Sequence, residues 1–285
     1  MSVAAETLAA RPRERRSASA TGFVRRHALT AYAVLAFAYL LVPIAVVIAF
    51  SFNHPAGRFN YTWQGFTLDN WKNWDAVPGM RDAIVASLEI AALASIFATV
   101  LGTLIALALV RYGFRGRGAT NLLIFLPMST PEIVLGASLL TLFLNLSGVF
   151  TLGFWTIFIA HVMFCISYVV VTVKARLIGF DRHLEEAAMD LGANELVTFA
   201  KVTLPLIAPA ILAGGLLSFA LSIDDFVITN FVFGSTVTFP VFVWGSARVG
   251  APPQVNVIGT VIFVVAVAVM LANVLVQNRR AKGAA

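Results

Sequence analysis

Long apolar runs alternate with short polar connections along this chain. Six of the runs are about as long as the roughly 20 helical residues that cross a hydrocarbon core. They cover residues 29–50, 84–110, 120–146, 150–173, 206–234 and 255–277. Of the 285 residues, 59% are apolar and only 12% are charged, whereas about a quarter of a soluble domain is charged. The pattern therefore predicts an all-α, polytopic membrane protein with six transmembrane helices.

Basic residues predict the orientation of these helices, because Lys and Arg concentrate in short cytoplasmic loops. With the N-terminus inside, only Arg58, Lys72, Arg81 and Arg248 of the 20 basic residues fall on the outer side. This bias, with attraction to anionic lipid headgroups, explains the net charge of +6 without a nucleic-acid partner. We expect three parts: a basic cytoplasmic tail at 1–28, one membrane domain at 29–277 and a cytoplasmic tail at 278–285.

The connection 174–204 differs from the other polar segments because it combines helix-forming residues, both signs of charge and a central glycine. Residues 184–191 have a helical composition, Gly192 can end that helix with a positive φ, and residues 195–202 can start another. The Leu-Pro pair at 204–205 predicts that the chain stops or turns before the fifth span. The spacing predicts a helix, turn and helix on the cytoplasmic side. From composition alone, an ordinary interfacial loop fits equally well.

The spacing within this connection resembles the Glu-Ala-Ala loop of permease subunits in binding-protein-dependent ABC importers. Glu-Ala-Ala at 186–188 is followed by Gly192 and then by Val202-x-Leu204-Pro205, where the family usually has isoleucine at position 202. The resemblance implies the type I importer permease fold, with a coupling helix seated in a groove of a separate ATPase. The implied ATPase-coupling residues are Glu186, Ala187, Ala188, Gly192, Glu195, Leu204 and Pro205.

Partner subunits follow from the same resemblance. It implies an ATP-binding subunit dimer, a second homologous permease subunit and a solute-binding protein, in a bacterial inner membrane. The chain has no Gly-Lys dipeptide and therefore no Walker A lysine, so ATP and magnesium would belong to the partner ATPase. Cys165 is the only cysteine and the four histidines are scattered. We expect no enzymatic activity, cofactor or metal site in this chain.

Acidic residues inside the predicted spans point to the cargo. Glu89, Glu132, Asp224 and Asp225 lie in spans whose interiors contain no Lys or Arg. Each such residue costs about 2.5–3.5 kcal/mol on insertion scales and marks a candidate functional site. These carboxylates must be protonated, be paired by another subunit, or face a watery path that admits a cation. At a rise of about 1.5 Å per residue, all four lie from mid-membrane outward.

Each acid also has a structural explanation. The Ser-Thr-Pro-Glu sequence predicts a helix restart with Thr130 as cap, Pro131 in the first turn and Glu132 at the positive helix end. Substrate contact by Glu132 is compatible with this, since carriers often use discontinuous helices. Asp224 and Asp225 cannot project in the same direction from one helix, so one can face the path while the other caps or pairs.

The roles of two ionisable residues in the spans, Glu89 and His161, are left open. Glu89 lies close enough to the outer interface to reach water. His161 could pair with a neighbouring helix or a backbone carbonyl, and its function is not predicted.

Additional motifs narrow the resemblance to spermidine/putrescine-type permeases. They are Ser51-Phe52-Asn53, Trp63-Gln64-Gly65-Phe66-Thr67, Ser222-Ile223-Asp224-Asp225-Phe226, Val249-Gly250 and Pro253-x-Val255-Asn256. The resemblance implies substrate-binding roles for Asp224, Asp225, Glu132, Ser222 and Trp71, and a coupling or exit role for Glu195. Polyamines suit this set, because their ammonium groups can contact dispersed carboxylates and aromatic faces. Related permeases carry opines, aminophosphonates or other small solutes.

The sequence thus predicts the permease subunit of an ATP-driven importer for a small organic cation, most favourably a polyamine. One alternative is an ion-coupled secondary carrier that uses intramembrane carboxylates as a proton relay. Another is a channel or scaffold subunit without a transport cycle.

Overall fold

The structure is a computed structural model that describes residues 20–57 and 59–283, and it consists of helices and the segments that connect them. The helices are α1 (Ala20–Ser51), α2 (Asp69–Lys72), α3 (Met80–Arg111), α4 (Arg117–Ser129), α5 (Glu132–Asn145), α6 (Phe154–Ile178), α7 (His183–Asp190), α8 (Glu195–Thr198), the π-helical segment η1 (Phe199–Thr203), α9 (Leu204–Asp224), α10 (Val227–Val232), α11 (Phe239–Val249) and α12 (Pro253–Gly283). The described residues form no β-strand, and one isolated bridge pairs Asn53 with Phe66. The predicted all-α class is confirmed.

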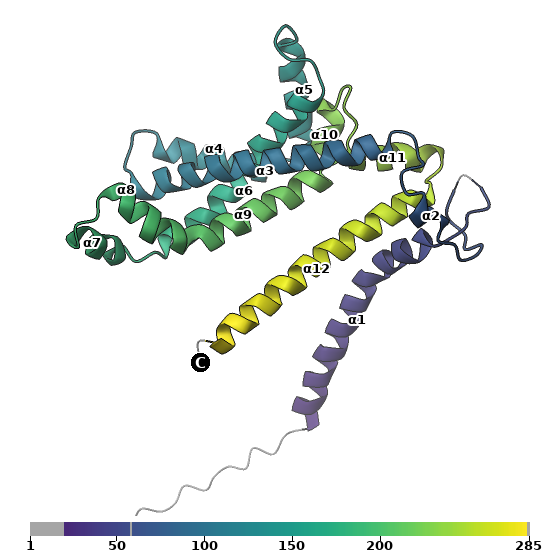
Figure 1. Ribbon diagram of the computed structural model, residues 1–285, viewed down its shortest axis with the longest axis horizontal. Coiled ribbons are helices and arrows are strands. Elements are labelled where there is room, and N and C mark those ends of the chain that lie inside the picture. Colours follow the sequence, from purple (N-terminus) through teal and green to yellow (C-terminus); the bar gives the residue numbers. More distant parts are fainter. Residues whose placement is uncertain (1–19, 58, 284–285) are drawn as a thin grey trace, which may run out of the picture.

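Helices α3, α6 and α9 pack side by side and form the core (Figure 1). Glycines permit their close approach: a Cβ at Gly102 of α3 would lie 2.8 Å from Val169 of α6. A Cβ at Gly215 of α9 would lie 2.9 Å from Thr99 of α3. Small residues at helix contacts are characteristic of membrane bundles, where tight packing replaces hydrophobic driving force. The three helices therefore form a closely packed scaffold for the elements around them.

Several helices are long and apolar enough to cross a membrane. Four qualify singly in the described residues, namely His27–Ser51, Met80–Arg111, Phe154–Ile178 and Glu195–Asp224. Helices α4 and α5 qualify together but are bent by 110°. Helix α12 contributes a shorter apolar stretch, Pro253–Ala268. This supports a polytopic membrane protein, while the number of six spans stays a prediction.

The predicted domain limits fall partly outside the described residues. Residues 1–19 and 284–285 lie beyond them, as does Arg58. Helix α1 begins at Ala20, ahead of the predicted span at 29, and α12 continues to Gly283, past 277. The two terminal helices therefore extend into the segments predicted as tails.

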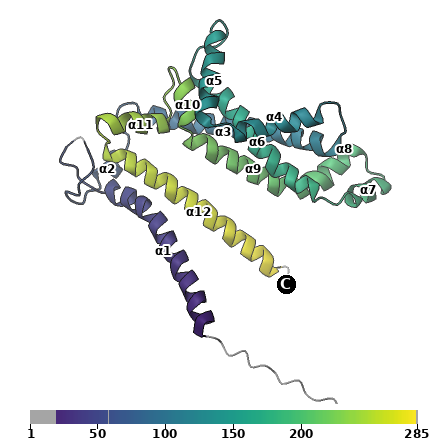
Figure 2. The ribbon, with the colours of Figure 1, turned by 180° about the vertical axis from the view of Figure 1, so that it is seen from behind.

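The coupling segment and the outer connection lie at opposite ends of the core. Helices α7 and α8 lie at one end, and α2 and α11 lie at the other, in both views (Figures 1 and 2). Helices α1 and α12 pack against each other and lead away from the core. This arrangement agrees with the predicted placement of 174–204 on one side and 51–83 on the other.

The prediction that the chain stops or turns at the Leu-Pro pair is wrong. The helix runs without interruption from Glu195 to Asp224, through the π-helical segment. In that segment the N–H of Leu204 bonds to the carbonyl of Phe199, one residue beyond the α-helical partner. Pro205 follows this wide turn directly, and it has no N–H to donate to the preceding turn. The wide turn therefore lets the helix pass a proline that would otherwise break it.

The fifth predicted span, 206–234, is also wrong as a single helix. Helix α9 ends at Asp224, Asp225 is extended with a ψ of 118°, and α10 starts at Val227. No glycine or proline causes this break. Side-chain hydrogen bonds of Asp225 within the break and of His161 in α6 hold it, as described below.

Candidate substrate and coupling sites

Two interrupted helices meet at one cavity of about 290 Å³. One interruption separates α4 from α5, and the other separates α9 from α10. The cavity is lined by Pro127, Glu132, Leu135, Phe164, Tyr168, Leu221, Asp224, Asp225, Phe226, Val227 and Ile228. The structure thus brings Glu132 to the same cavity as Asp224 and Asp225, which lie far from it in the sequence.

The break between α4 and α5 follows from Pro131. Thr130 is extended, with a ψ of 134°, as sterics require of a residue before proline. Its hydroxyl donates to the carbonyl of Leu126 at 2.7 Å, so the predicted cap by Thr130 is wrong. Pro131 precedes the first turn, contrary to expectation, and α5 starts at Glu132. Glu132 does lie at the positive end of α5, as predicted.

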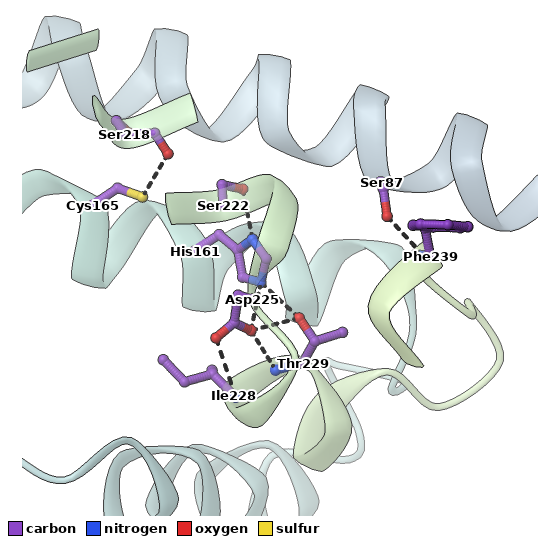
Figure 3. Close-up of polar contacts among 9 residues, drawn as sticks. All are labelled: Ser87, His161, Cys165, Ser218, Ser222, Asp225, Ile228, Thr229 and Phe239. Carbon is purple, nitrogen blue, oxygen red and sulfur yellow. Dashed lines mark hydrogen bonds and ion pairs between the residues drawn. The ribbon is translucent and has the colours of Figure 1, made fainter. Parts of the chain in front are cut away.

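The break between α9 and α10 is held by Asp225 (Figure 3). Its carboxylate accepts the backbone N–H of Thr229 at 2.8 Å, the hydroxyl of Thr229 at 2.7 Å and the N–H of Ile228 at 3.4 Å. These are N–H groups of the first turn of α10, which have no partner within the helix. Asp225, which precedes the N-cap residue Phe226, therefore satisfies these N–H groups, and the chain can stop one helix and start another without glycine or proline.

His161 of α6 holds this break from the opposite side (Figure 3). Its Nδ1 lies 2.7 Å from Oγ of Ser222 and its Nε2 lies 2.8 Å from Oγ1 of Thr229. Because the Thr229 hydroxyl donates to Asp225, it must accept from His161, which places a proton on Nε2. Nε2 is also 3.3 Å from Asp225 Oδ2, and the two side chains are 1% and 6% exposed. His161 therefore ties α6 to α9 and α10.

The two adjacent aspartates have different surroundings. The Asp225 side chain is only 6% exposed and makes the hydrogen bonds just described, whereas Asp224 is exposed at the cavity. Glu132 is exposed at the same cavity. Among the described residues, neither Asp224 nor Glu132 forms an ion pair with Lys, Arg or His. Two carboxylates without a countercharge therefore face one hollow that also presents the aromatic rings of Phe164 and Tyr168.

Other predicted substrate-binding residues lie apart from the cavity. Ser222 points to His161 behind the break. Trp71 stacks on Phe52 with ring centroids 5.3 Å apart, and its indole N–H donates to Ser51 Oγ at 3.2 Å. Glu89 is exposed on α3 and does not line the cavity. In this chain Ser222 and Trp71 contact protein groups rather than the hollow that holds the acids.

The coupling segment adopts the predicted helix, turn and helix. Helix α7 ends at a left-handed Gly192 with a φ of +91°. The N–H of Ala193 bonds to the carbonyl of Ala188 at 3.1 Å and that of Gly192 to Met189 at 2.9 Å, which is the Schellman arrangement. Asn194 then caps α8 by accepting the N–H of Val197 at 2.9 Å. The prediction that Gly192 ends the helix with a positive φ is confirmed.

The predicted coupling residues fall on different surfaces of this segment. Glu186 and Ala187 are exposed, Ala188 is half-buried, and α7 has no buried residue. Glu195 lines a second cavity of about 540 Å³, between α3 and the coupling segment. Leu204 and Pro205 are exposed at the start of α9.

Sequence reasoning named His161 as a residue that could pair with a neighbouring helix, and it does so with Ser222 of α9 and Thr229 of α10. One position with extensive contacts was missed. Glu185, which pairs with Arg111 at 2.5 Å, adjoins the motif residue Glu186 and carries no distinguishing pattern. No group of three or more metal-ligating side chains occurs within the described part of the chain.

Comparison with known proteins identifies the family of this chain. Residues 76–281 match the family described as binding-protein-dependent transport system inner membrane component. The chain belongs to this family. As an inner membrane component it is a multi-pass transport subunit and not an enzyme.

Curated relatives within this family are named as polyamine permeases. The chain is 41% identical over 248 residues to the spermidine/putrescine transport system permease protein PotC of Escherichia coli strain K12, covering 87% of this chain and 92% of the relative. It is 40% identical over 235 residues to the putrescine transport system permease protein PotI of the same strain, covering 80% and 83%. Haemophilus influenzae PotC is 38% identical over 250 residues, covering 87% and 96%. Each of these is a transport permease, so the secondary-carrier alternative gains no support.

Solved structures share the fold. A bacterial ABC transporter involved in the import of the acidic polysaccharide alginate aligns with a TM-score of 0.63 at 19% identity, over 94% of this chain and 99% of that one. An amino acid ABC transporter aligns with a TM-score of 0.57 at 18% identity, over 75% and 100%. At these identities the likeness concerns the helical architecture alone.

Proposed function

We propose that this chain is the transmembrane permease subunit of an ATP-driven ABC importer whose cargo is a small organic cation, specifically a polyamine such as spermidine or putrescine. The proposed substrate class rests on two carboxylates, those of Glu132 and Asp224, which lie at one cavity between two helix breaks. Neither forms an ion pair with a basic side chain among the described residues. The names of the 38–41% identical relatives support the same class.

The chemistry of the cavity favours an extended polycation. A carboxylate in or near a membrane is costly unless it meets a positive charge or water. Asp224 and Glu132 come from different helices, so two ammonium groups of one cargo molecule can each meet a carboxylate. The rings of Phe164 and Tyr168 offer cation–π and apolar contact to the alkyl segments between the ammonium groups. Asp225 holds the geometry of the site, and the predicted substrate roles of Ser222 and Trp71 become supporting ones.

The coupling segment suits an ATPase partner. Leu191, directly after α7, is 90% exposed, and Leu196, in α8, is 80% exposed. Exposed apolar surface on one short segment is typical of an interaction site. Glu186 and the small Ala187, which are also exposed, lie on α7 itself. We infer that this surface seats in a groove of an ATP-binding subunit, which supplies ATP and magnesium.

The complete transporter would contain an ATPase dimer, this chain, a second homologous permease subunit and a solute-binding protein on the outer side. We assign this chain six spans in the type I importer arrangement, with both termini cytoplasmic. The binding protein would release cargo toward Asp224 and Glu132, and ATP binding and hydrolysis would move α7 and open the cavity to the cytoplasm.

Reconstituted transport tests this proposal. The four-component complex is placed in proteoliposomes, and uptake of labelled spermidine and putrescine is measured with ATP on the ATPase side. We expect uptake that depends on ATP and on the binding protein, with competition by unlabelled polyamines and none by acidic solutes. Uptake driven by a pH gradient without ATP would overturn the importer, and ATP-driven uptake of a non-cationic solute alone would overturn the substrate class.

A further inference from the structure

Helix α7 is joined to the transmembrane core through Glu185. Arg111, the last residue of α3, places Nη1 at 2.5 Å from Glu185 Oε2 and Nη2 at 2.6 Å from Oε1. The hydroxyl of Thr203, at the end of the π-helical segment, also donates to Glu185 Oε1. One carboxylate therefore connects α3, α7 and the base of α9. We call Arg111, Glu185 and Thr203 the Glu185 anchor.

The surroundings make this a strong connection. The Arg111 and Glu185 side chains are only 17% and 16% exposed, and Thr203 is buried. A bidentate guanidinium–carboxylate pair fixes orientation as well as distance, and partial burial reduces screening by salt. The guanidinium also lies 5.3 Å from the ring centroid of Phe180, just before α7. Exposed surface pairs lack these supports and are worth little.

Other contacts of α7 with the molecule are few. The helix buries none of its residues and packs against the neighbouring α8 and η1. The anchor gives α7 a direct link to α3. Beyond Thr203 the helix continues to Asp224 at the substrate cavity. The whole Glu195–Asp224 helix has 30 residues, about 45 Å at 1.5 Å per residue. A displacement of α7 therefore has a continuous helical route to the cargo site.

We propose that the Glu185 anchor transmits movement of α7 to α3 and α9, so that Glu185 and the adjacent Glu186 have separate tasks. Glu186, whose side chain is 61% exposed and contacts His183, faces the ATPase. Glu185 faces inward and acts as a positioning residue. This inference rests on the proposed function, because it takes α7 to be the element that the ATPase moves.

The test uses the complete reconstituted complex with three readouts: ATPase retained through purification, rate of ATP hydrolysis, and uptake per ATP hydrolysed. Glu185→Gln and Arg111→Gln each keep the ATPase and its hydrolysis but lower uptake per ATP about tenfold, within the range typical of coupling between sites. The double variant is no worse than either single one, because the pair acts as a unit. Asp75→Asn, an exposed carboxylate in the outer connection at the opposite end of the molecule, is the control and behaves as wild type.

Unchanged uptake per ATP in both Glu185→Gln and Arg111→Gln would overturn the anchor. If Glu185→Gln prevents assembly, Thr203→Val decides, since it keeps the ion pair and removes one hydrogen bond: lowered uptake per ATP supports the anchor and unchanged uptake overturns it. A merely structural role would lower assembly and hydrolysis together. A wild-type complex that binds no ATPase would instead overturn the proposed function. The coupling role of the anchor would then be overturned as well.

Discussion

Asp225 is held by three hydrogen bonds at the start of α10, whereas the adjacent Asp224 is open to the cavity shared with Glu132. Consecutive residues can differ in this way because the chain turns between them. The helix ends at Asp224 and Asp225 is already extended. Asp225 therefore stabilises the helix break that forms the site, whereas Asp224 faces the cavity in which we expect the cargo to bind.

The first prediction concerns stability. Asp225→Ala leaves buried donors at the start of α10 without acceptors, which costs about 1–3 kcal/mol. Within the described part of the chain, Asp224→Ala removes no hydrogen bond to another side chain, so it should change stability by less than about 0.5 kcal/mol. Thermal unfolding of the purified chain in detergent measures both. Equal destabilisation by the two variants would contradict the separation of roles.

A second prediction concerns His161. His161→Leu removes partners from Ser222, Thr229 and Asp225 and should lower the free energy of unfolding by about 1–3 kcal/mol for each group left unsatisfied. His161→Gln keeps hydrogen-bonding capacity and should lose less. The double variant His161→Leu with Ser222→Ala should be no less stable than His161→Leu alone, since the unpaired hydroxyl is gone. Additive losses in unfolding measurements would show that the two side chains do not act together.

The contact between α5 and α10 gives a third prediction. A Cβ at Gly136 would lie 2.5 Å from Cδ2 of Phe231, so Gly136→Ala must displace that ring. Overpacking of this kind costs about 1–3 kcal/mol. Gly259→Ala is the matched control, because its Cβ would meet Val47 at an ordinary 3.5 Å. Phe231→Leu should relieve the loss caused by Gly136→Ala, as measured by thermal stability; no relief would place the strain elsewhere.

A fourth prediction concerns the turn after α7. Gly192 has a φ of +91°, and an L-residue in that region costs roughly 1–2 kcal/mol. Gly192→Ala should therefore weaken the turn and lower ATPase retention by the complex. Gly118→Ala is the control, since Gly118 lacks a positive φ and no atom lies within 4 Å of the position that its Cβ would take. Co-purification of the ATPase with each variant is the measurement, and equal retention would argue against the coupling role of this turn.

Part of this architecture is readable from sequence because it depends on local chemistry. Apolar runs predicted the long helices, Pro131 predicted a helix restart, and Gly192 predicted the end of α7. These features arise from backbone sterics and from burial in lipid, which each segment experiences by itself.

The remaining features depend on residues that are far apart in the chain. The break after Asp224 needs His161, which lies 61 residues before Ser222. Glu185 is indistinguishable from Glu186 until Arg111, 74 residues away, is placed beside it. Pro205 looked like a helix stop because the preceding π-helical turn has no sequence pattern of its own. Tertiary packing decides such cases.

The central claim is that Asp224 and Glu132 bind the cargo. The most direct measurement is uptake of labelled spermidine by the reconstituted complex carrying Asp224→Asn and Glu132→Gln together. We predict that uptake falls at least about a hundredfold, equivalent to roughly 2.7 kcal/mol, while assembly and ATP hydrolysis persist. Asp75→Asn, an exposed carboxylate in the outer connection, should leave uptake unchanged. Wild-type uptake by the double variant would contradict the account.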